Sequence, residues 1–180
     1  LGLKQFLATS LYFSLDPYIR MLMGGGWTFL GQGMTPGQVM VGRTLGEVIE
    51  SDHPDFKPGD HIVGRLGWQE YAVSDGADLD FKVKPKKGVP RTAAMGACGS
   101  NGPTAWAGMK MIGQPKEGET VLVSAAAGSV GSAVGQIAKA MGCRAVGIAG
   151  GPEKCRIVTD EFCFDACLDY KREDLSGQIK

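Results

Sequence analysis

The sequence has no excess of charge of either sign, with 19 basic and 19 acidic side chains in 180 residues. The balance also holds within each half of the chain, so it argues against a nucleic-acid-binding arm, a polybasic membrane surface and an acidic tail. Hydrophobic residues make up 43% of the chain, which is too much for a disordered protein and enough for a core. The length allows one large domain or two small ones.

The five cysteines are odd in number and contain no C-x-x-C pair. This pattern fits neither a disulfide-rich secreted protein nor a zinc ribbon. No secretory signal opens the chain, so we expect reduced thiols and a cytoplasmic protein. The sequence starts at Leu1 rather than Met, and we therefore expect a fragment of a longer protein.

One uncharged segment, residues 121–138, contains a G-x-x-x-G pattern from Gly131 to Gly135. A transmembrane dimer helix would have these features. The segment also contains serine, glutamine and further glycine, and it divides into a β-branched part and a part with helical period. We therefore favour a strand followed by a helix over a membrane span.

Short apolar segments between turn residues predict β-structure in the first ninety residues. The expected strands are 6–15, 38–50, 61–64 and 68–74, with bulges at Gly42 and Gly46 and a loop over 24–37. Closely spaced strands with bulges favour a small closed or partly closed barrel.

The pattern changes after a lysine- and proline-rich linker at 82–90. Helices are expected at 92–98, 104–111, 129–141 and 152–162, and strands at 120–124, 144–149 and 166–170. Strands that alternate with helices imply a parallel sheet covered by helices. We therefore predict an α/β chain of two domains, 1–90 and 91–180.

The turn between the strand at 120–124 and the following helix has the spacing of a dinucleotide-binding fingerprint. Ala126 takes the first glycine position, Gly128 the second and Gly131 the third. Gly128 would let the backbone approach a diphosphate, and Gly131 would let the helix pack on the strand. The helix N-terminus favours an anion. The alternative is a strand–helix turn that is merely rich in glycine.

The end of the second strand of this region favours NADP over NAD. An NAD site usually has an acidic residue there, about 20 residues after the first glycine. This chain has Gly150, Gly151 and Pro152, followed by Lys154. An ammonium suits a 2′-phosphate, although spacing alone is equally compatible with a solvated helix cation.

Motifs spread over nearly the whole chain resemble one enzyme family. They are S-L-D-P-Y-I-R at 14–20, G-W-Q-E-Y-A-V at 67–73, G-Q-P-K-E-G-E at 113–119, V-S-A-A-A-G-S-V-G at 123–131, G-G-P-E-K at 150–154 and D-Y-K at 169–171. The family is that of the zinc-independent medium-chain dehydrogenases/reductases. Within it, the chain is similar to the leukotriene B4 12-hydroxydehydrogenase and prostaglandin reductase group of NADP-dependent alkenal/enone reductases.

The resemblance implies a GroES-like β-barrel followed by a Rossmann doubly wound parallel sheet that is truncated here, with NADP between the two domains. It places Tyr18 near the substrate pocket, although Tyr18 would serve equally as an aromatic residue at a core edge. The cofactor-binding residues that it implies are Gly128, Ser129, Val130, Gly131, Gly150, Lys154 and Tyr170.

The chain also departs from the family pattern. Zinc-dependent relatives carry Gly-His-Glu where this chain has Gly42-Arg43-Thr44, and the four-cysteine lobe is missing. We therefore expect no metal. Residues 98–106 are an unusual version of the G-L-T-A-Y segment, and Cys163 stands where relatives often end a helix with glycine, so we expect a strained cap there.

The implied reaction is hydride transfer from NADPH to the C=C bond of an α,β-unsaturated carbonyl, with stabilisation of the resulting oxyanion. No catalytic residue is assigned, and His53 and His61 are expected to be structural. An NADPH quinone reductase and a truncated, non-catalytic nucleotide-binding fragment remain alternatives. The expected partner is a small unsaturated carbonyl compound, without nucleic acid or membrane, and the full-length protein is expected to be a homodimer.

Overall fold

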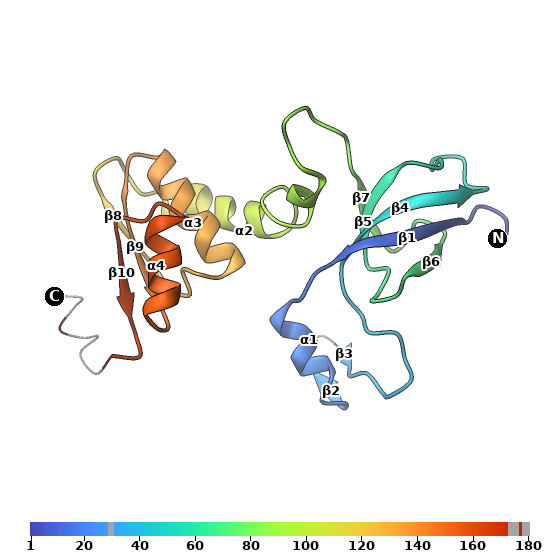
Figure 1. Cartoon of the computed structure of the whole chain (residues 1–180), viewed down its shortest axis with the longest axis horizontal. Helices are drawn as coiled ribbons and strands as arrows, with labels where there is room; N and C mark the ends of the chain where they lie inside the picture. Colours follow the sequence, from blue (N-terminus) through green and yellow to red (C-terminus); the bar gives the residue numbers. More distant parts are fainter. Residues whose placement is uncertain (29–30, 173–176, 178–180) are drawn as a thin grey trace. The chain divides into compact units, whose positions relative to one another are not determined.

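The computed structural model describes residues 1–28, 31–172 and 177. The chain divides into two compact units, Leu1–Met95 and Gly96–Lys180, and Figure 1 shows the elements of each. The first unit is built on an antiparallel sheet and the second on a parallel sheet on which helices pack. The predicted α/β class, a GroES-like part followed by a partial Rossmann sheet, is confirmed.

The first unit contains a five-stranded sheet in the order β6-β1-β4-β5-β7. Its elements are β1 (Phe6–Phe13), α1 (Pro17–Leu22), β2 (Trp27–Thr28), β3 (Gly31–Gln32), β4 (Thr44–Ser51), β5 (His61–Gly64), β6 (Tyr71–Ser74), β7 (Leu79–Lys82) and the 3₁₀ helix η1 (Arg91–Ala94). Inward side chains of these strands, together with Leu66 after β5, form a core that includes Phe6, Ala8, Val48, Ile62 and Ala72.

The sheet has bulges, but not where the sequence predicted them. The register between β1 and β4 shifts twice, which leaves Ile49 of β4 and Leu11 of β1 as the extra residues. Gly46 lies in β4 opposite the bulge at Leu11 rather than forming one. Gly42 precedes β4, and a Cβ there would lie 2.5 Å from Nε1 of Trp68. Close contact with an indole therefore explains this glycine.

Three other predictions for the first unit are corrected. The expected strand at 38–50 begins only at Thr44, because residues 40 and 42 accept single hydrogen bonds from residues 68 and 67 and form no regular ladder. The expected loop at 24–37 contains the pair β2–β3, although residues 29–30 lie outside the described residues. The strand β7 was not predicted, and the expected helix at 92–98 is only the 3₁₀ helix η1.

The second unit follows the predicted alternation closely. Its elements are α2 (Asn101–Ala107), the π-helix η2 (Gly108–Gly113), β8 (Thr120–Val123), α3 (Ser129–Ala140), β9 (Arg144–Ala149), α4 (Pro152–Asp160) and β10 (Ala166–Asp169). The three strands are parallel, in the order β10-β9-β8. Each strand and each of the helices α3 and α4 ends within two residues of its predicted position.

Glycines in α3 and β9 let these two elements approach the ring of Phe164. Phe164 is buried, and a Cβ on Gly135 of α3 would lie 1.9 Å from its ring. A Cβ on Gly147 of β9 would lie 2.8 Å from side-chain atoms of both Ala126 and Val158. The glycines of the G-x-x-x-G pattern thus serve packing within the unit. None of the helices in the described residues combines the length and apolar character that crossing a membrane requires.

Candidate functional site

The N-terminus of α3 follows the turn that comes after β8. Gly128 takes the N-cap position with extended backbone, and no side chain caps the helix. The first hydrogen bond of the helix runs from the Ser132 amide to the Gly128 carbonyl, at 2.9 Å. The amides of Ser129, Val130 and Gly131 therefore have no carbonyl acceptor within the helix, and no acidic residue lies in the first turn. The arrangement suits an anion.

The turn before α3 is tight around Gly131. A Cβ on Gly131 would lie 2.4 Å from the carbonyl oxygen of Ala125, so this position requires glycine for packing, as predicted. The left-handed residue of the turn is Ala125, with φ of 48°. Ala126, at the first glycine position of the fingerprint, is fully buried, and its amide donates to the Ile148 carbonyl at 3.0 Å. That bond joins the turn to the end of β9.

Tyr170 lies against the loop that follows β9. A Cβ on Gly150 would lie 2.7 Å from the Tyr170 hydroxyl oxygen, so the phenol covers this glycine. The Tyr170 amide donates to the Ala149 carbonyl at 3.1 Å, which continues the pairing of β10 with β9. Tyr170 is 56% exposed and lies at the carboxyl edge of the sheet.

Asp169 holds the same loop by hydrogen bonds, and it was not predicted to have a role in the site. Its Oδ1 accepts hydrogen bonds from the amides of Gly151, at 2.7 Å, and Lys171, at 3.0 Å. These two bonds lower the pKa of the Asp169 carboxyl below its usual value. The signal was available in the sequence, because the carboxyl ends of parallel strands meet at one edge and Asp169 ends the third strand.

Lys154 lies in the first turn of α4, next to this loop. The helix begins at Pro152 after Gly151, whose φ is 97°, and no side chain caps it. Lys154 is exposed. The parallel sheet thus places three groups of predicted cofactor residues at one edge: residues 128–131 after β8, Gly150 and Lys154 after β9, and Tyr170 after β10.

Tyr18 lies in the first unit, half-buried in α1. The Arg43 guanidinium is close enough to Tyr18 and Asp16 for their charges to raise its pKa, but the main cause of that rise is a hydrogen bond to Asp80. The Arg43 Nε and the Asp80 Oδ2 are 2.5 Å apart. The hydroxyl of Thr44 donates to the Gly67 carbonyl at 2.9 Å. Arg43 and Thr44 therefore have hydrogen-bond partners within the first unit.

Neither histidine belongs to a cluster with the predicted site residues. The ring of His53 packs on Phe6 and Phe56, and its Nδ1 accepts a hydrogen bond from Asp55. His61 is 8% exposed, and its Nε2 lies 3.6 Å from a Glu47 carboxylate oxygen, too far for a hydrogen bond. Across residues 1–28, 31–172 and 177, no three His, Cys, Asp or Glu side chains are grouped so that they could hold a metal ion.

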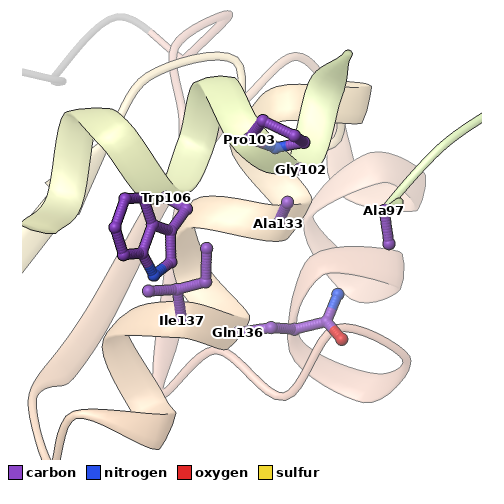
Figure 2. Close-up of a pocket in the computed structure, with 7 residues that line it drawn as sticks. All are labelled: Ala97, Gly102, Pro103, Trp106, Ala133, Gln136 and Ile137. Atoms are coloured by element: carbon purple, nitrogen blue, oxygen red, sulfur yellow. The ribbon is translucent and has the colours of Figure 1, made fainter. Parts of the chain in front are cut away.

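Each unit also contains a pocket that is separate from these residues. In the second unit, a groove of about 490 Å³ lies between α2 and α3, and Figure 2 shows Trp106 and Ile137 along it. In the first unit, a groove of about 570 Å³ is lined by residues that include Tyr12, Leu45 and Arg91. Neither of these two pockets is lined by a predicted site residue.

Comparison with known proteins shows what this chain is similar to. Residues 1–82 match a family described as the N-terminal domain of oxidoreductase. The chain is 46% identical over 178 residues to the NADPH-dependent curcumin reductase of Escherichia coli, covering 99% of this chain and 51% of that protein. It is 40% identical to the NADP(+)-dependent 2-alkenal reductase of Nicotiana tabacum, with 99% and 52% covered.

A solved structure shows the same fold. CurA from Vibrio vulnificus in complex with NADPH is 42% identical, with a TM-score of 0.85, and the match covers 99% of this chain and 52% of that one. Over nearly its whole length, the chain is therefore similar to these reductases. It spans about half the length of the curated relatives that it matches. The resemblance to the alkenal/enone reductase group is confirmed by these relatives, whose names give the cofactor as NADPH in one case and NADP(+) in the other.

Proposed function

We propose that this chain binds NADPH and belongs to a reductase that saturates the C=C bond of an α,β-unsaturated carbonyl compound. One structural observation carries the proposal. The uncapped N-terminus of α3 shares the carboxyl edge of the parallel sheet with Lys154 and Tyr170. Ligands of open α/β sheets bind at this edge. The names of the relatives supply the cofactor and the class of substrate.

The residues present fit the cofactor at two points. The first-turn amides of α3, from Ser129 to Gly131, would hold the diphosphate, because they have no acceptor within the helix. The Lys154 ammonium and the Tyr170 hydroxyl would hold the 2′-phosphate. Asp169 directs Oδ1 to backbone amides of the loop, so it shapes the loop around Gly150.

When bound, NADPH supplies the hydride that adds to the β-carbon of the unsaturated carbonyl compound. In the first unit, Tyr18 would orient the substrate by a hydrogen bond to its carbonyl oxygen, where negative charge develops. Arg43 is a cation paired with Asp80 and cannot serve as a zinc ligand, which supports a zinc-independent reaction.

We further propose a domain division in which residues 1–90 serve the substrate and residues 91–180 serve the cofactor. The two compact units of the chain, which divide between Met95 and Gly96, support this proposal. A cytoplasmic location, a homodimeric full-length protein and the absence of nucleic-acid and membrane partners complete it. The even balance of 19 basic and 19 acidic side chains supports the absence of a nucleic-acid partner.

The cofactor assignment is tested by Lys154→Ala in the 180-residue chain. A hydrogen bond to a charged group is worth about 1.5 to 3 kcal/mol, so we expect NADPH binding to weaken by about 10- to 150-fold. NADH binding should stay unchanged, because NADH has no 2′-phosphate. Titration calorimetry with each cofactor measures both constants. Arg156 is exposed on another face of α4. Arg156→Ala is therefore the control and should alter neither the NADPH nor the NADH binding constant.

Equal losses for NADPH and NADH in Lys154→Ala would contradict the assignment of the 2′-phosphate. The substrate class is tested separately in a protein that contains this chain and the remaining half found in its relatives. Turnover of NADPH with alkenals and enones, and little with quinones, is expected. A preference for quinones would favour the quinone reductase alternative.

A further inference from the structure

Two loops at the carboxyl edge of the parallel sheet are joined by consecutive contacts. One loop follows β9 and leads into α4, and the other follows β10. The Tyr170 amide donates to the Ala149 carbonyl at 3.1 Å, and a Cβ on Gly150 would lie 2.7 Å from the Tyr170 hydroxyl oxygen. The Gly151 amide then donates to Oδ1 of Asp169 at 2.7 Å. Three consecutive residues of the first loop thus contact the end of β10 or the residue after it.

Asp169 also holds the second of these loops. Its Oδ1 accepts another hydrogen bond from the Lys171 amide, at 3.0 Å. Its backbone carbonyl accepts one from the Arg172 amide, at 3.1 Å. Tyr170 lies inside the turn that these bonds close. One carboxylate oxygen therefore fixes both the turn that carries Tyr170 and the loop that leads into α4.

The loop before α4 determines where Lys154 lies. Gly151 is the N-cap of α4, with φ of 97°, and no side chain caps this helix. The Gly151 carbonyl accepts the first hydrogen bond of the helix, from the Cys155 amide at 3.1 Å. Lys154 is in that first turn. Because the helix begins at Gly151, the way in which Asp169 holds the Gly151 amide sets the direction of the turn that carries Lys154.

We propose that Asp169 is a positioning residue for cofactor choice, which holds Lys154 and Tyr170 in place for the 2′-phosphate of NADPH without contacting the phosphate. This inference rests on the proposed function. An ionised carboxylate only accepts hydrogen bonds, and its charge opposes a phosphate placed beside it. The Oδ1 of Asp169 is instead used by two backbone amides. The acceptor oxygen, and not the negative charge, is therefore the property that the site requires.

The inference is tested by Asp169→Ala and Asp169→Asn in the 180-residue chain, with NADPH and NADH each titrated by calorimetry. Alanine removes the acceptor oxygen. We expect NADPH to bind about 10-fold more weakly, which is the low end of the loss for Lys154→Ala because the ammonium is displaced and not removed. NADH binding should stay unchanged, because NADH has no 2′-phosphate. Asparagine keeps Oδ1 as an acceptor, so Asp169→Asn should bind NADPH as well as the unchanged chain.

Asp160→Ala is the matched control. Asp160 is exposed and lies at the other end of α4, so its loss removes a carboxylate without touching either loop and should alter neither binding constant. Equal losses for NADPH and NADH in Asp169→Ala would point to a damaged fold or to a direct contact with the ribose, and would overturn the inference. A loss in Asp169→Asn as large as that in Asp169→Ala would show that the charge is required, and would overturn it too.

A second background tests whether Asp169 acts through the two residues that it is proposed to position. In a chain that carries Lys154→Ala and Tyr170→Phe, both groups proposed to hold the 2′-phosphate are gone. Adding Asp169→Ala should then weaken NADPH binding no further. A further loss as large as in the unchanged chain would mean that Asp169 acts elsewhere, and would refute the positioning role.

Amide exchange measured by NMR without cofactor separates this inference from the proposed function. The Gly151 amide should be protected in the unchanged chain and in Asp169→Asn, and should exchange quickly in Asp169→Ala. The Ala145 amide, which donates to Asp165 at 2.7 Å, is the control and should stay protected in all three. Equal exchange of Gly151 in the three chains would overturn the inference even if NADPH binds. If the unchanged chain bound no NADPH while Gly151 was protected, the failure would lie in the proposed function and not in the loop that Asp169 holds.

Discussion

The cores of the two units of this chain are filled differently. The first unit fills its core with large side chains. Of the largest fully buried side chains among the described residues, Phe6, Leu45, Ile62, Val48, Val63 and Thr44 lie in the first unit, and only Val158 lies in the second. In the second unit, Gly131, Gly135 and Gly147 stand where a Cβ would collide with neighbours, as Gly42 and Gly64 do in the first.

This difference predicts that the two units should respond differently to lost core volume. An antiparallel sheet that is covered by its own inward side chains depends on their volume. In the parallel sheet, helices lie on the strands and a tight turn leads into α3, so backbone must approach backbone. The core of the first unit should therefore be the more sensitive to removed atoms, and the packing of α3 in the second unit should be sensitive to added ones.

The largest expected effect is that of Phe6→Ala. Phe6 is fully buried and packs at 4.7 Å, centroid to centroid, on Phe56. Its loss leaves a cavity and should destabilise the first unit by about 3 to 5 kcal/mol. Hydrogen exchange measured by mass spectrometry should show lost protection within residues 1–95 only. Equal loss in the second unit would mean that the two units do not respond separately.

Gly135→Ala should have the next largest effect, in the second unit. The new methyl group would lie 1.9 Å from the buried Phe164 ring, and overpacking of this kind costs about 1 to 3 kcal/mol or more. The same exchange experiment should show lost protection within residues 96–180. Gly108→Ala is the matched control, because a Cβ there meets nothing within 4 Å. An unchanged Gly135→Ala protein would refute the contrast between the units.

In each unit, one aspartate carboxylate accepts hydrogen bonds from two other segments of the chain. A low pH should therefore destabilise both units. Asp165 accepts hydrogen bonds from Lys139 Nζ at 2.6 Å and the Ala145 amide at 2.7 Å. Asp60 accepts from Lys82 Nζ at 2.7 Å and the Lys57 amide at 2.8 Å. The hydrogen bond from the lysine is the main cause that lowers the pKa of each carboxyl, and the hydrogen bond from the backbone amide lowers it further.

Because these pKa values are lower in the folded chain, the stabilisation is complete above the usual aspartate pKa of about 3.9 and is lost as the pH falls further. Asp165→Asn should remove the acid sensitivity that Asp165 contributes to the second unit and leave that of the first unit unchanged. Urea unfolding at a series of pH values below 5, with exchange data for each unit, measures this. A steeper loss in the variant would contradict the expectation.

The smallest effect is expected for Cys163→Gly. Cys163 has φ of 59°, a left-handed conformation that disfavours residues with a Cβ by about 1 to 2 kcal/mol. Part of the gain is offset because glycine is more flexible in the unfolded chain, so we expect a net stabilisation of about 0.5 to 1 kcal/mol. Cys163→Ala keeps the Cβ and is the control that should show no gain. Equal midpoints of denaturation for both variants would exclude backbone strain.

The parallel unit was predictable because its signals are local. The helical stripe of α3, the proline at the start of α4 and the β-branched strands fix each element within a short window. The elements of the antiparallel unit were harder to predict. The residues of β7 pair with β5, and residues 40 and 42 bond to residues 68 and 67. These partners are distant in sequence or lie beyond a turn, so local composition says little about them.

The candidate site shows the same division. The G-x-x-G spacing of 128–131 and the position of Lys154 predict binding residues after two of the strands, because both signals are contained in short segments of the sequence. The role of Asp169 in holding Gly151, and the contact of Tyr170 with Gly150, depend on β10 lying beside β9. The residue of the turn with a left-handed backbone is Ala125. Because this residue is not glycine, the sequence does not reveal the conformation.

The order of strands and helices after residue 118 follows from the sequence alone, and so do our proposals of a diphosphate turn and of a phosphorylated ribose, because periodicity, glycine spacing and charge are local properties. The tertiary structure alone decided where the bulges fall and why Gly135 and Gly147 lack side chains. Those outcomes depend on the registration of distant segments, which arises only when helices and strands pack together.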